Sequence, residues 1–202
     1  MTRNLTPAER EAVERAADAV ADGELVVYPT ETVYGLGADA LDPDAVETVF
    51  DLKGRSRDDP LSLGVASVDD ALAYTHPTDR AEAFMREFLP GPATVVVERD
   101  EVVPDELTAG SDRVGVRVPD HPVALSLADR AGPITATSAN RSGAGSVRRV
   151  DDLDEPIREG VAVVVDGGET PGTESTVVDP VSGEIHRRGA GADEIEAWLA
   201  EH

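Results

Sequence analysis

The sequence predicts an α/β fold in which helices cover the faces of a mixed β-sheet. Three observations lead to this prediction. Some stretches of strand length, such as "ELVVYP", are continuously apolar, as strands buried on both faces are. Others, such as "STVVD" and "GEIHR", follow each other through a short turn, as hairpin strands do. Helical segments separate these strands, which is the pattern of α/β domains. The length of 202 residues predicts one domain over residues 1–202.

The first half of the chain opens with a helix whose start is well marked. Thr6 is the expected N-cap, Pro7 takes the first helical position, Glu9 completes a capping box, and Gly23 follows the end of the helix. The strand "ELVVYP" comes next, and a second helix, "DPDAVETVFDLKG", is capped by Asp42. The remaining elements of this half are a short strand at 61–66 and two helical pieces within 67–88.

The second half continues the alternation of strands and helices. The segments "ATVVVER" and "RVGVRVP" are predicted strands, and Asp120 is the expected cap of a helix that ends near Gly132. The strand "PITAT" opens into the long loop "SANRSGAGSVRR". The last elements are a short helix at 151–159, the strands "VAVVVDGG", "STVVD" and "GEIHR", and a closing helix at 193–200.

The net charge of the chain is strongly negative, at −23 from 41 acidic and 18 basic residues. Two interpretations compete: an acidic surface that repels nucleic acid and suits a basic partner, or an adaptation of solubility to very high salt. We favour the second, because the acidic residues are spread along the chain. At molar salt the Debye length is about 3 Å, so their mutual repulsion is screened.

Several classes of protein and site are excluded by what the sequence lacks. Cysteine is absent, which rules out disulfides, thiolate metal sites and cysteine nucleophiles. Neither a signal peptide nor an apolar run near the roughly 20 residues of a membrane span is found, so we expect a cytoplasmic protein with no membrane partner. The motifs GxxxxGK[ST], HExxH and GxSxG are missing, and the four histidines show no ligand spacing, so no protein-held metal site is expected.

Six polar clusters lie at the ends of predicted strands, where open α/β sheets bind ligands. They are "PTETVYGLG", "KGRSRDDPL", "LPGPAT", "VGVRVPDHP", "TSANRSG" and "GTESTVVD". Each alone is explained by a turn, a cap or a charged helix end. Together they are rich in hydroxyls and arginines, which suit an anionic ligand such as phosphate. Lys53, the only lysine in the chain, lies in one of them.

These clusters, in this order and spacing, resemble the YrdC/TsaC family of threonylcarbamoyl-AMP synthases. The resemblance runs from about residue 25 to residue 189, and the string "PTETVYGLG" is highly specific. It implies a twisted mixed sheet with helices on both faces around a concave cleft, in the short, single-domain form of the family.

The reaction implied by the resemblance joins L-threonine, bicarbonate and ATP. The N-carboxylated threonine attacks the α-phosphate of ATP, and pyrophosphate leaves. Since the carboxylate is the nucleophile, catalysis rests on positioning and electrostatics. Mg²⁺ is expected to arrive with ATP. The product would pass to a separate tRNA threonylcarbamoyl transferase complex, while direct RNA binding is left open.

The resemblance also assigns roles to individual residues. Thr32, Arg117 and Ser175 match contacts to L-threonine, with the Arg117 guanidinium on the carboxylate. Lys53 and Arg55 match catalytic cations that face the ATP phosphates. The other matches to the ATP site are Asp59, Ser138, Asn140, Ser142, Ser146 and Arg187.

Two departures from the family pattern keep an alternative open. Asp59 stands where many members have asparagine, and Gly64 stands where they have histidine, which motivates a non-catalytic RNA- or nucleotide-binding paralogue on the same fold. A carbamoyl-transfer enzyme ranks last, since the chain lacks the cysteines of such proteins. Glu31 and Glu174 either brace their loops or take part in catalysis, and Tyr34 is expected to pack. Four further arginines either are surface charges or replace missing basic contacts: Arg57, Arg113, Arg148 and Arg149.

Overall fold

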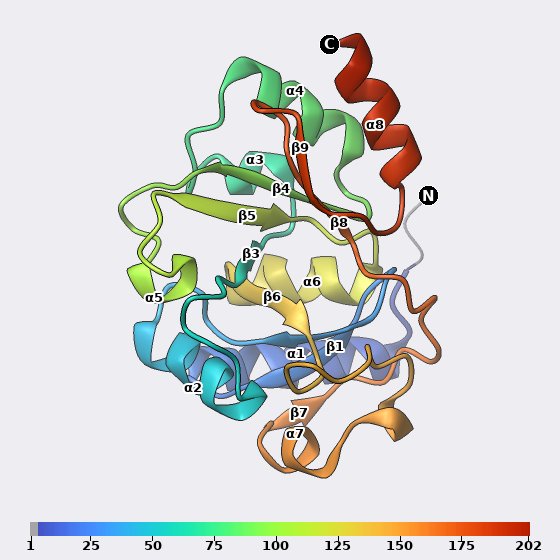
Figure 1. Ribbon diagram of the computed structural model, residues 1–202. Coiled ribbons are helices and arrows are strands. Elements are labelled where there is room, and N and C mark those ends of the chain that lie inside the picture. The colour runs from blue at the N-terminus through green and yellow to red at the C-terminus, as the bar shows by residue number, and fades with distance from the viewer. Residues whose placement is uncertain (1–3) are drawn as a thin grey trace.

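The computed structural model describes residues 4–202, so the first three residues of the predicted domain lie outside the described part. Its centre is a nine-stranded sheet in the order β7-β1-β2-β6-β3-β5-β4-β8-β9 (Figure 1). The pairs β1/β7, β3/β5 and β4/β8 are parallel and the others antiparallel, which confirms the predicted mixed sheet. The strands are β1 (Val26–Pro29), β2 (Tyr34–Gly37), β3 (Ser62–Gly64), β4 (Ala93–Glu98), β5 (Arg113–Arg117), β6 (Ile134–Ser138), β7 (Val163–Val164), β8 (Thr176–Asp179) and β9 (Glu184–Arg187).

Helices flank the sheet on both sides (Figure 1). One apolar cluster joins the first helix and the helix after β5 to β1 and β7, and a larger one joins the other face of the sheet to most of the remaining helices. Among the described residues, no helix combines the length and the apolar character needed to cross a membrane. The helices are α1 (Pro7–Ala21), α2 (Pro43–Lys53), α3 (Val68–Ala71), α4 (Asp79–Phe88), α5 (Asp105–Thr108), α6 (Pro122–Ala131), α7 (Glu155–Glu159) and α8 (Ala192–Glu201), with a 3₁₀ turn at Val150–Asp152.

Strand β1 shows why its sequence is continuously apolar. Val26 and Tyr28 belong to the cluster with α1 and α6, whereas Val27 belongs to the cluster on the opposite face. Successive side chains of a strand point to opposite faces, so a strand covered on both sides needs apolar residues at every position.

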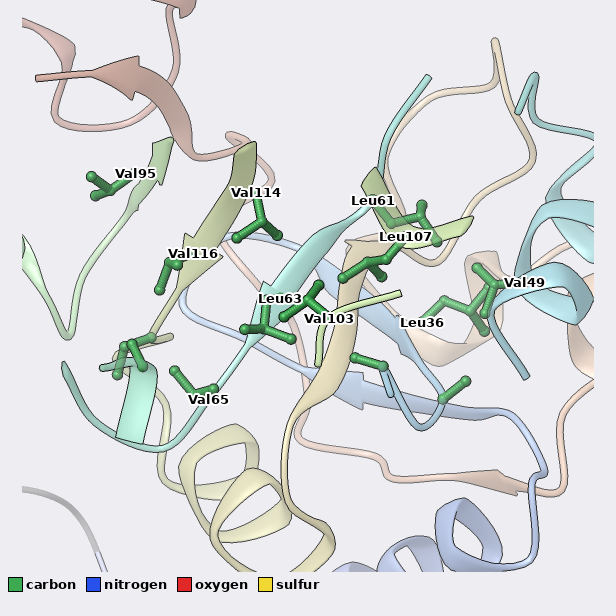
Figure 2. Packing of buried hydrophobic residues seen from close by; sticks show 14 of the residues in the cluster. Leu36, Val49, Leu61, Leu63, Val65, Val95, Val103, Leu107, Val114 and Val116 are labelled. Atoms are coloured by element: carbon green, nitrogen blue, oxygen red, sulfur yellow. The ribbon is translucent and has the colours of Figure 1, made fainter. Parts of the chain in front are cut away.

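The central strands are covered on one face only. Leu63, Val95 and Val116, from β3, β4 and β5, point into the larger core together with residues of α2 and α5 (Figure 2). Their neighbours Ser62, Thr94 and Gly115 face the other way and line a cavity. The period of two therefore places a packed core and an open polar floor on opposite faces of the same strands.

Several element boundaries differ from the sequence-based expectation. The N-cap of α6 is His121 rather than Asp120, because Pro122 takes the first helical position and the cap is the residue before it. The strand expected at 161–168 is reduced to β7, since the chain turns away at "DGG". Strand β2 and helix α5 lie in segments where no strand and no helix were predicted.

Candidate functional site

The polar floor belongs to a cavity of about 950 Å³. Strands β1 to β6, β8 and β9 line it, together with the end of α2 and the loops between these elements. Gly115 keeps the floor open, because a Cβ there would lie 2.9 Å from Ser62 Oγ and 3.0 Å from Thr94 Cγ2. The cavity is large enough for a nucleotide and an amino acid together, since small-molecule sites usually measure about 300–1,000 Å³.

The loop between β1 and β2 carries the string "TET". Thr30 Oγ1 donates to Val33 O at 2.6 Å and accepts from the amides of Thr32 and Val33 at 3.2 Å, so it closes the turn. The hydroxyls of Thr30 and Thr32 lie 2.9 Å apart. This local network holds the Thr32 side chain in the cavity wall.

Arg117, at the end of β5, lies in the cavity wall next to that loop. Its Nη2 donates to Glu31 Oε1, and its Nη1 donates to Gly91 O. Its Nε donates to no acceptor within residues 4–202, which leaves one donor without a protein partner. Burial raises the pKa of Tyr28 in the same wall, with Arg117 opposing the shift and Glu31 adding to it.

Glu31 is held mainly by that arginine. Its other oxygen, Oε2, is buried without a hydrogen-bond partner in the described part of the chain. A buried carboxylate needs a compensating charge, so Glu31 depends on Arg117 for its stability.

Ser175 links the two halves of the cavity. Its hydroxyl lies 2.8 Å from Thr94 Oγ1, and Arg187 Nη2 donates to it at 3.1 Å. Arg187 Nε also donates to Ser175 O at 3.1 Å. A residue predicted to contact threonine and a residue predicted to contact ATP are therefore in direct contact.

Lys53 lies at the end of α2 and is buried, with 2% of its surface exposed. Its Nζ donates to Ser138 O and, at 2.6 Å, to Asn140 O. Burial lowers the pKa of Lys53 to about 8; Arg55 lowers it further, while Glu174 and Asp154 raise it. Lys53 thus holds the loop after β6 in place through these two hydrogen bonds and also lines the cavity.

Arg55 stands beside Lys53 on the same wall. It donates from Nε to Asp59 O at 2.9 Å and from Nη2 to Pro60 O at 3.1 Å. Burial lowers the pKa of Arg55, Asp59 and Glu174 raise it, and Arg187 lowers it. The backbone contacts fix the position of the guanidinium relative to Lys53.

The loop after β6 is tied down at several points. The amide of Ala139 donates to Tyr34 O at 2.8 Å, and the amide of Tyr34 donates to Val147 O at 3.0 Å. The amide of Ser142 donates to Lys53 O at 2.9 Å. Tyr34 itself is fully buried and donates to Gly168 O at 2.7 Å, so it packs, as expected.

Ten of the eleven sequence-predicted site residues line this one cavity. Ser146 does not line it, although its hydroxyl donates to Glu174 Oε1 at 2.8 Å, and Glu174 does. The residues brought together are Thr32, Lys53, Arg55, Asp59, Arg117, Ser138, Asn140, Ser142, Ser175 and Arg187.

The sequence does not single out Thr94, although Thr94 belongs to the cluster "LPGPAT", and it leaves Arg113 open between a surface charge and a basic contact. Arg113 also lines the cavity, where its Nη1 lies 2.8 Å from Asp179 Oδ2. Burial raises the pKa of Asp179, but hydrogen bonds from Arg113, Ser182 and two backbone amides outweigh it and leave the pKa at about 2. Both cavity residues occupy strand positions that alternate with core valines, and this alternation is the signal that identifies them.

Other charged residues lie outside the cavity. Arg57 pairs with Glu47 and Asp51 on the surface, and Arg148 and Arg149 both pair with Glu169. Within residues 4–202, no group of three or more His, Asp or Glu side chains is placed to hold a metal ion.

Comparisons with known proteins identify the family and the fold of the chain. The Sua5_yciO_yrdC family model, described as "Telomere recombination", matches residues 18–189. The threonylcarbamoyl-AMP synthase of Pyrococcus abyssi is 44% identical over 195 residues, covering 92% of this chain and 56% of that protein. The chain thus spans a little over half the length of that curated relative.

Two solved structures are similar to the fold. The structure of P. abyssi Sua5 complexed with L-threonine has a TM-score of 0.89 and 39% identity, covering 98% of this chain and 59% of that one. Escherichia coli YciO has a TM-score of 0.85 at 22% identity, covering 96% of this chain and 99% of that one, which is a likeness of fold.

Proposed function

The chain belongs to the Sua5_yciO_yrdC family, and on that premise we propose that the protein is an L-threonylcarbamoyl-AMP synthase. The reaction converts L-threonine, bicarbonate and ATP into threonylcarbamoyl-AMP, pyrophosphate and water. The carboxylate of N-carboxythreonine forms a bond to the α-phosphorus of ATP, and the bond from that phosphorus to the pyrophosphate oxygen breaks.

One observation carries this proposal. Hydroxyls and cations from segments far apart in the sequence line one cavity of about 950 Å³, and they include Thr32, Lys53, Arg117, Ser138 and Ser175. A phosphoryl-transfer site needs positioned donors and positive charge rather than a side-chain nucleophile. This cavity offers both.

We assign the Thr32, Arg117 and Ser175 end of the cavity to L-threonine. Arg117 suits the threonine carboxylate, because a guanidinium binds carboxylates through charge-assisted N–H donors and its Nε has no protein acceptor within residues 4–202. Glu31 orients that guanidinium through its hydrogen bond with Nη2. The hydroxyls of Thr32 and Ser175 are donors and acceptors for the remaining polar atoms of the substrate.

The other end of the cavity suits the nucleotide. Lys53 and Arg55 are the proposed catalytic cations, which stabilise charge on the transferring phosphate, and Arg187, Ser138, Asn140 and Ser142 complete the wall. ATP enters as its Mg²⁺ complex, with the ion held by phosphate oxygens and water. Asp59, on this wall, replaces a neutral side chain of the family pattern, and the adjacent Arg55 offsets its charge.

The product, a mixed anhydride, would pass to a separate transferase complex that modifies tRNA in the cytoplasm.

The acidic composition is consistent with a protein that folds and acts at high salt concentration. We therefore expect the free energy of unfolding to rise with KCl concentration up to the molar range. A denaturation series at fixed pH measures this, and equal stability in low and molar KCl would contradict the salt adaptation.

The activity is tested by incubating the full chain with MgATP, bicarbonate and L-threonine in molar KCl. Pyrophosphate release should depend on threonine and should be lost in Arg117→Ala. The matched control is Arg130→Ala, since Arg130 pairs with Glu14 on the surface at 3.3 Å and lies outside the cavity. Release that is unchanged when threonine is omitted would exclude the synthase.

The alternative of a non-catalytic RNA-binding paralogue is tested with the same preparation. Phosphate-based RNA binding weakens steeply with salt. Arg148 and Arg149, an exposed basic pair outside the cavity, both pair with Glu169, which offsets one of their two positive charges. Filter binding of tRNA in molar KCl without pyrophosphate release would favour the paralogue over the synthase.

A further inference from the structure

A carboxylate lies among the cations of the nucleotide end. Lys53, Arg55 and Arg187 line this part of the cavity, and Glu174 lines it with them. Arg187 Nη1 is 2.8 Å from Glu174 Oε2. Glu174 also acts electrostatically on Lys53 and Arg55, whose pKa values it raises against the effect of burial. A negative charge of the protein itself is thus located where three positive charges converge.

Glu174 joins two segments across the cavity. Ser146 Oγ, in the loop after β6, donates to Oε1 at 2.8 Å, while Arg187, in β9, holds Oε2. Arg187 in turn donates to Ser175. Both carboxylate oxygens are therefore occupied in the ligand-free protein, and the carboxylate keeps the loop and the arginine in register.

The contact between Glu174 and Arg187 is exchangeable. The two side chains are 32% and 46% exposed, and ion pairs with this access to water contribute about 0–1 kcal/mol. A polyphosphate carries several charges and meets three cations at once through charge-assisted hydrogen bonds, which are stronger than neutral ones. Such a ligand outcompetes a single carboxylate.

We propose that Glu174 is a positioning residue that occupies the place of an anionic ligand, and that a polyphosphate binds by replacing its carboxylate at Arg187. The inference rests on the proposed function, which supplies the polyphosphate as the ligand class. In the empty protein Glu174 keeps Arg187 aligned, and on binding it leaves the guanidinium to the phosphate oxygens.

The change in anion affinity on loss of the Glu174 charge has opposite signs for this role and for a merely structural one. If Glu174 only braced the loop, loss of its charge would weaken anion binding. If it competes with the ligand, loss of its charge strengthens binding. The probe is inorganic tripolyphosphate in the presence of EDTA, so that no divalent cation bridges a carboxylate and a phosphate.

The experiment is calorimetric titration of the full chain with tripolyphosphate, at a KCl concentration that keeps the wild type folded. Glu174→Gln retains a hydrogen-bonding side chain and is expected to bind three- to tenfold more tightly than the wild type. The matched control is Glu169→Gln, which removes another glutamate 2.8 Å from an arginine, outside the cavity. Its affinity should change less than twofold.

Unchanged or weaker binding by Glu174→Gln, an equal gain in Glu169→Gln, or no binding by any of the three proteins would overturn the inference. If Glu174→Gln does not fold, Glu174→Ala serves the same test, because the side chain lies at a cavity wall and its removal leaves no void in the core. The pyrophosphate assay on the wild type is independent of this titration. An active wild type without the predicted gain therefore rejects the role of Glu174 alone, and an inactive wild type with the gain rejects the synthase alone.

Discussion

The two ends of the cavity hold their arginines in different ways. At the proposed threonine end, Arg117 and Glu31 are 7% and 18% exposed, and Arg117 also donates to backbone carbonyls. At the nucleotide end, Arg187 and Glu174 are 46% and 32% exposed. A buried ion pair is costly to break, whereas an exposed one exchanges partners readily. The proposed amino-acid end is thus preformed, whereas the ion pair at the proposed phosphate end can exchange partners.

The largest change in the free energy of unfolding should come from removing Arg117, the arginine of the proposed threonine end. Arg117→Ala leaves Glu31 buried without a counter-charge, so we expect the free energy of unfolding to fall by about 3–5 kcal/mol. Chemical denaturation in molar KCl measures this. Thermal shifts should show that threonine no longer stabilises the variant while ATP largely does.

The surface variant Arg130→Ala provides the reference for that loss. Its pair with Glu14 is exposed and should contribute less than about 1 kcal/mol. If Arg117→Ala were no less stable than Arg130→Ala, the description of the threonine end as a preformed buried site would be wrong.

Lys53 tests the nucleotide end. Lys53→Met leaves the carbonyls of Ser138 and Asn140 without their donor, at a cost of about 1–3 kcal/mol. It also removes a cation from the phosphate wall, so ATP affinity should fall about tenfold, which corresponds to about 1.4 kcal/mol. Calorimetric titration measures the affinity, and an unchanged value would remove Lys53 from the ATP site.

The pKa of Lys53 sets a pH dependence for the same end. Since this pKa is about 8, the side chain loses its charge between about pH 7 and 9, and ATP affinity should fall over that range. In the absence of ligand, the free energy of unfolding changes with pH in the opposite direction to the ATP affinity. Between pH 8 and the ordinary lysine value the unfolded chain binds more protons, so the contribution of Lys53 to stability rises with pH. Lys53→Met should lose both trends, and their persistence would point to another group.

Thr94 gives a smaller, neutral comparison. Thr94→Val keeps the shape of the side chain but removes the hydroxyl 2.8 Å from Ser175 Oγ, and should cost about 1 kcal/mol. Threonine affinity should fall more than ATP affinity, because Ser175 is assigned to the proposed amino-acid end. Thr48→Val is the control, as Thr48 makes its hydrogen bond on the exposed surface of α2. Equal losses of both affinities would mean that Thr94 does not act through Ser175.

The smallest effect on stability is expected for Arg187→Ala. Its partner Glu174 is accessible to water, so the free energy of unfolding should change by less than about 1 kcal/mol. ATP affinity should nevertheless drop clearly, since the guanidinium faces the cavity. A stability loss as large as that of Arg117→Ala would erase the distinction between the two ends.

Much of this organisation could be predicted from the sequence. The string around Thr32 and the placement of Arg117 and Ser175 at strand ends led to one shared cavity, and the alternation of strand types led to a mixed sheet. Local capping rules predict the starts of α1 and α2, but the cap of α6 is His121 rather than the predicted Asp120, because Pro122 takes the first helical position. The short β2 and α5 have too few residues for a periodic pattern.

The contacts between side chains within the site could not be predicted from the sequence. Thr94 meets Ser175 because β4 and β8 pair in parallel with Ala93 opposite Thr176, and this register follows from the assembled sheet rather than from either strand. The contacts of Glu174 with Ser146 and Arg187 likewise join segments that are distant in sequence. Residue type and spacing identify candidates, whereas pairing partners require the three-dimensional register.

The alternation along the central strands assigns ligand preference and thermal stability to different residues, although the two properties usually change together when a protein diverges. In β3, β4, β5 and β8, neighbouring residues face either the packed interior or the ligand space. A variant library restricted to Ser62, Thr94 and Val177 would explore ligand preference with little disturbance of packing, whereas Gly115 must stay glycine because a Cβ there would lie 2.9 Å from Ser62 Oγ. One restricted to Leu63, Val95, Val116 and Val178 would explore thermal tolerance instead, so the two can be engineered in parallel and then combined.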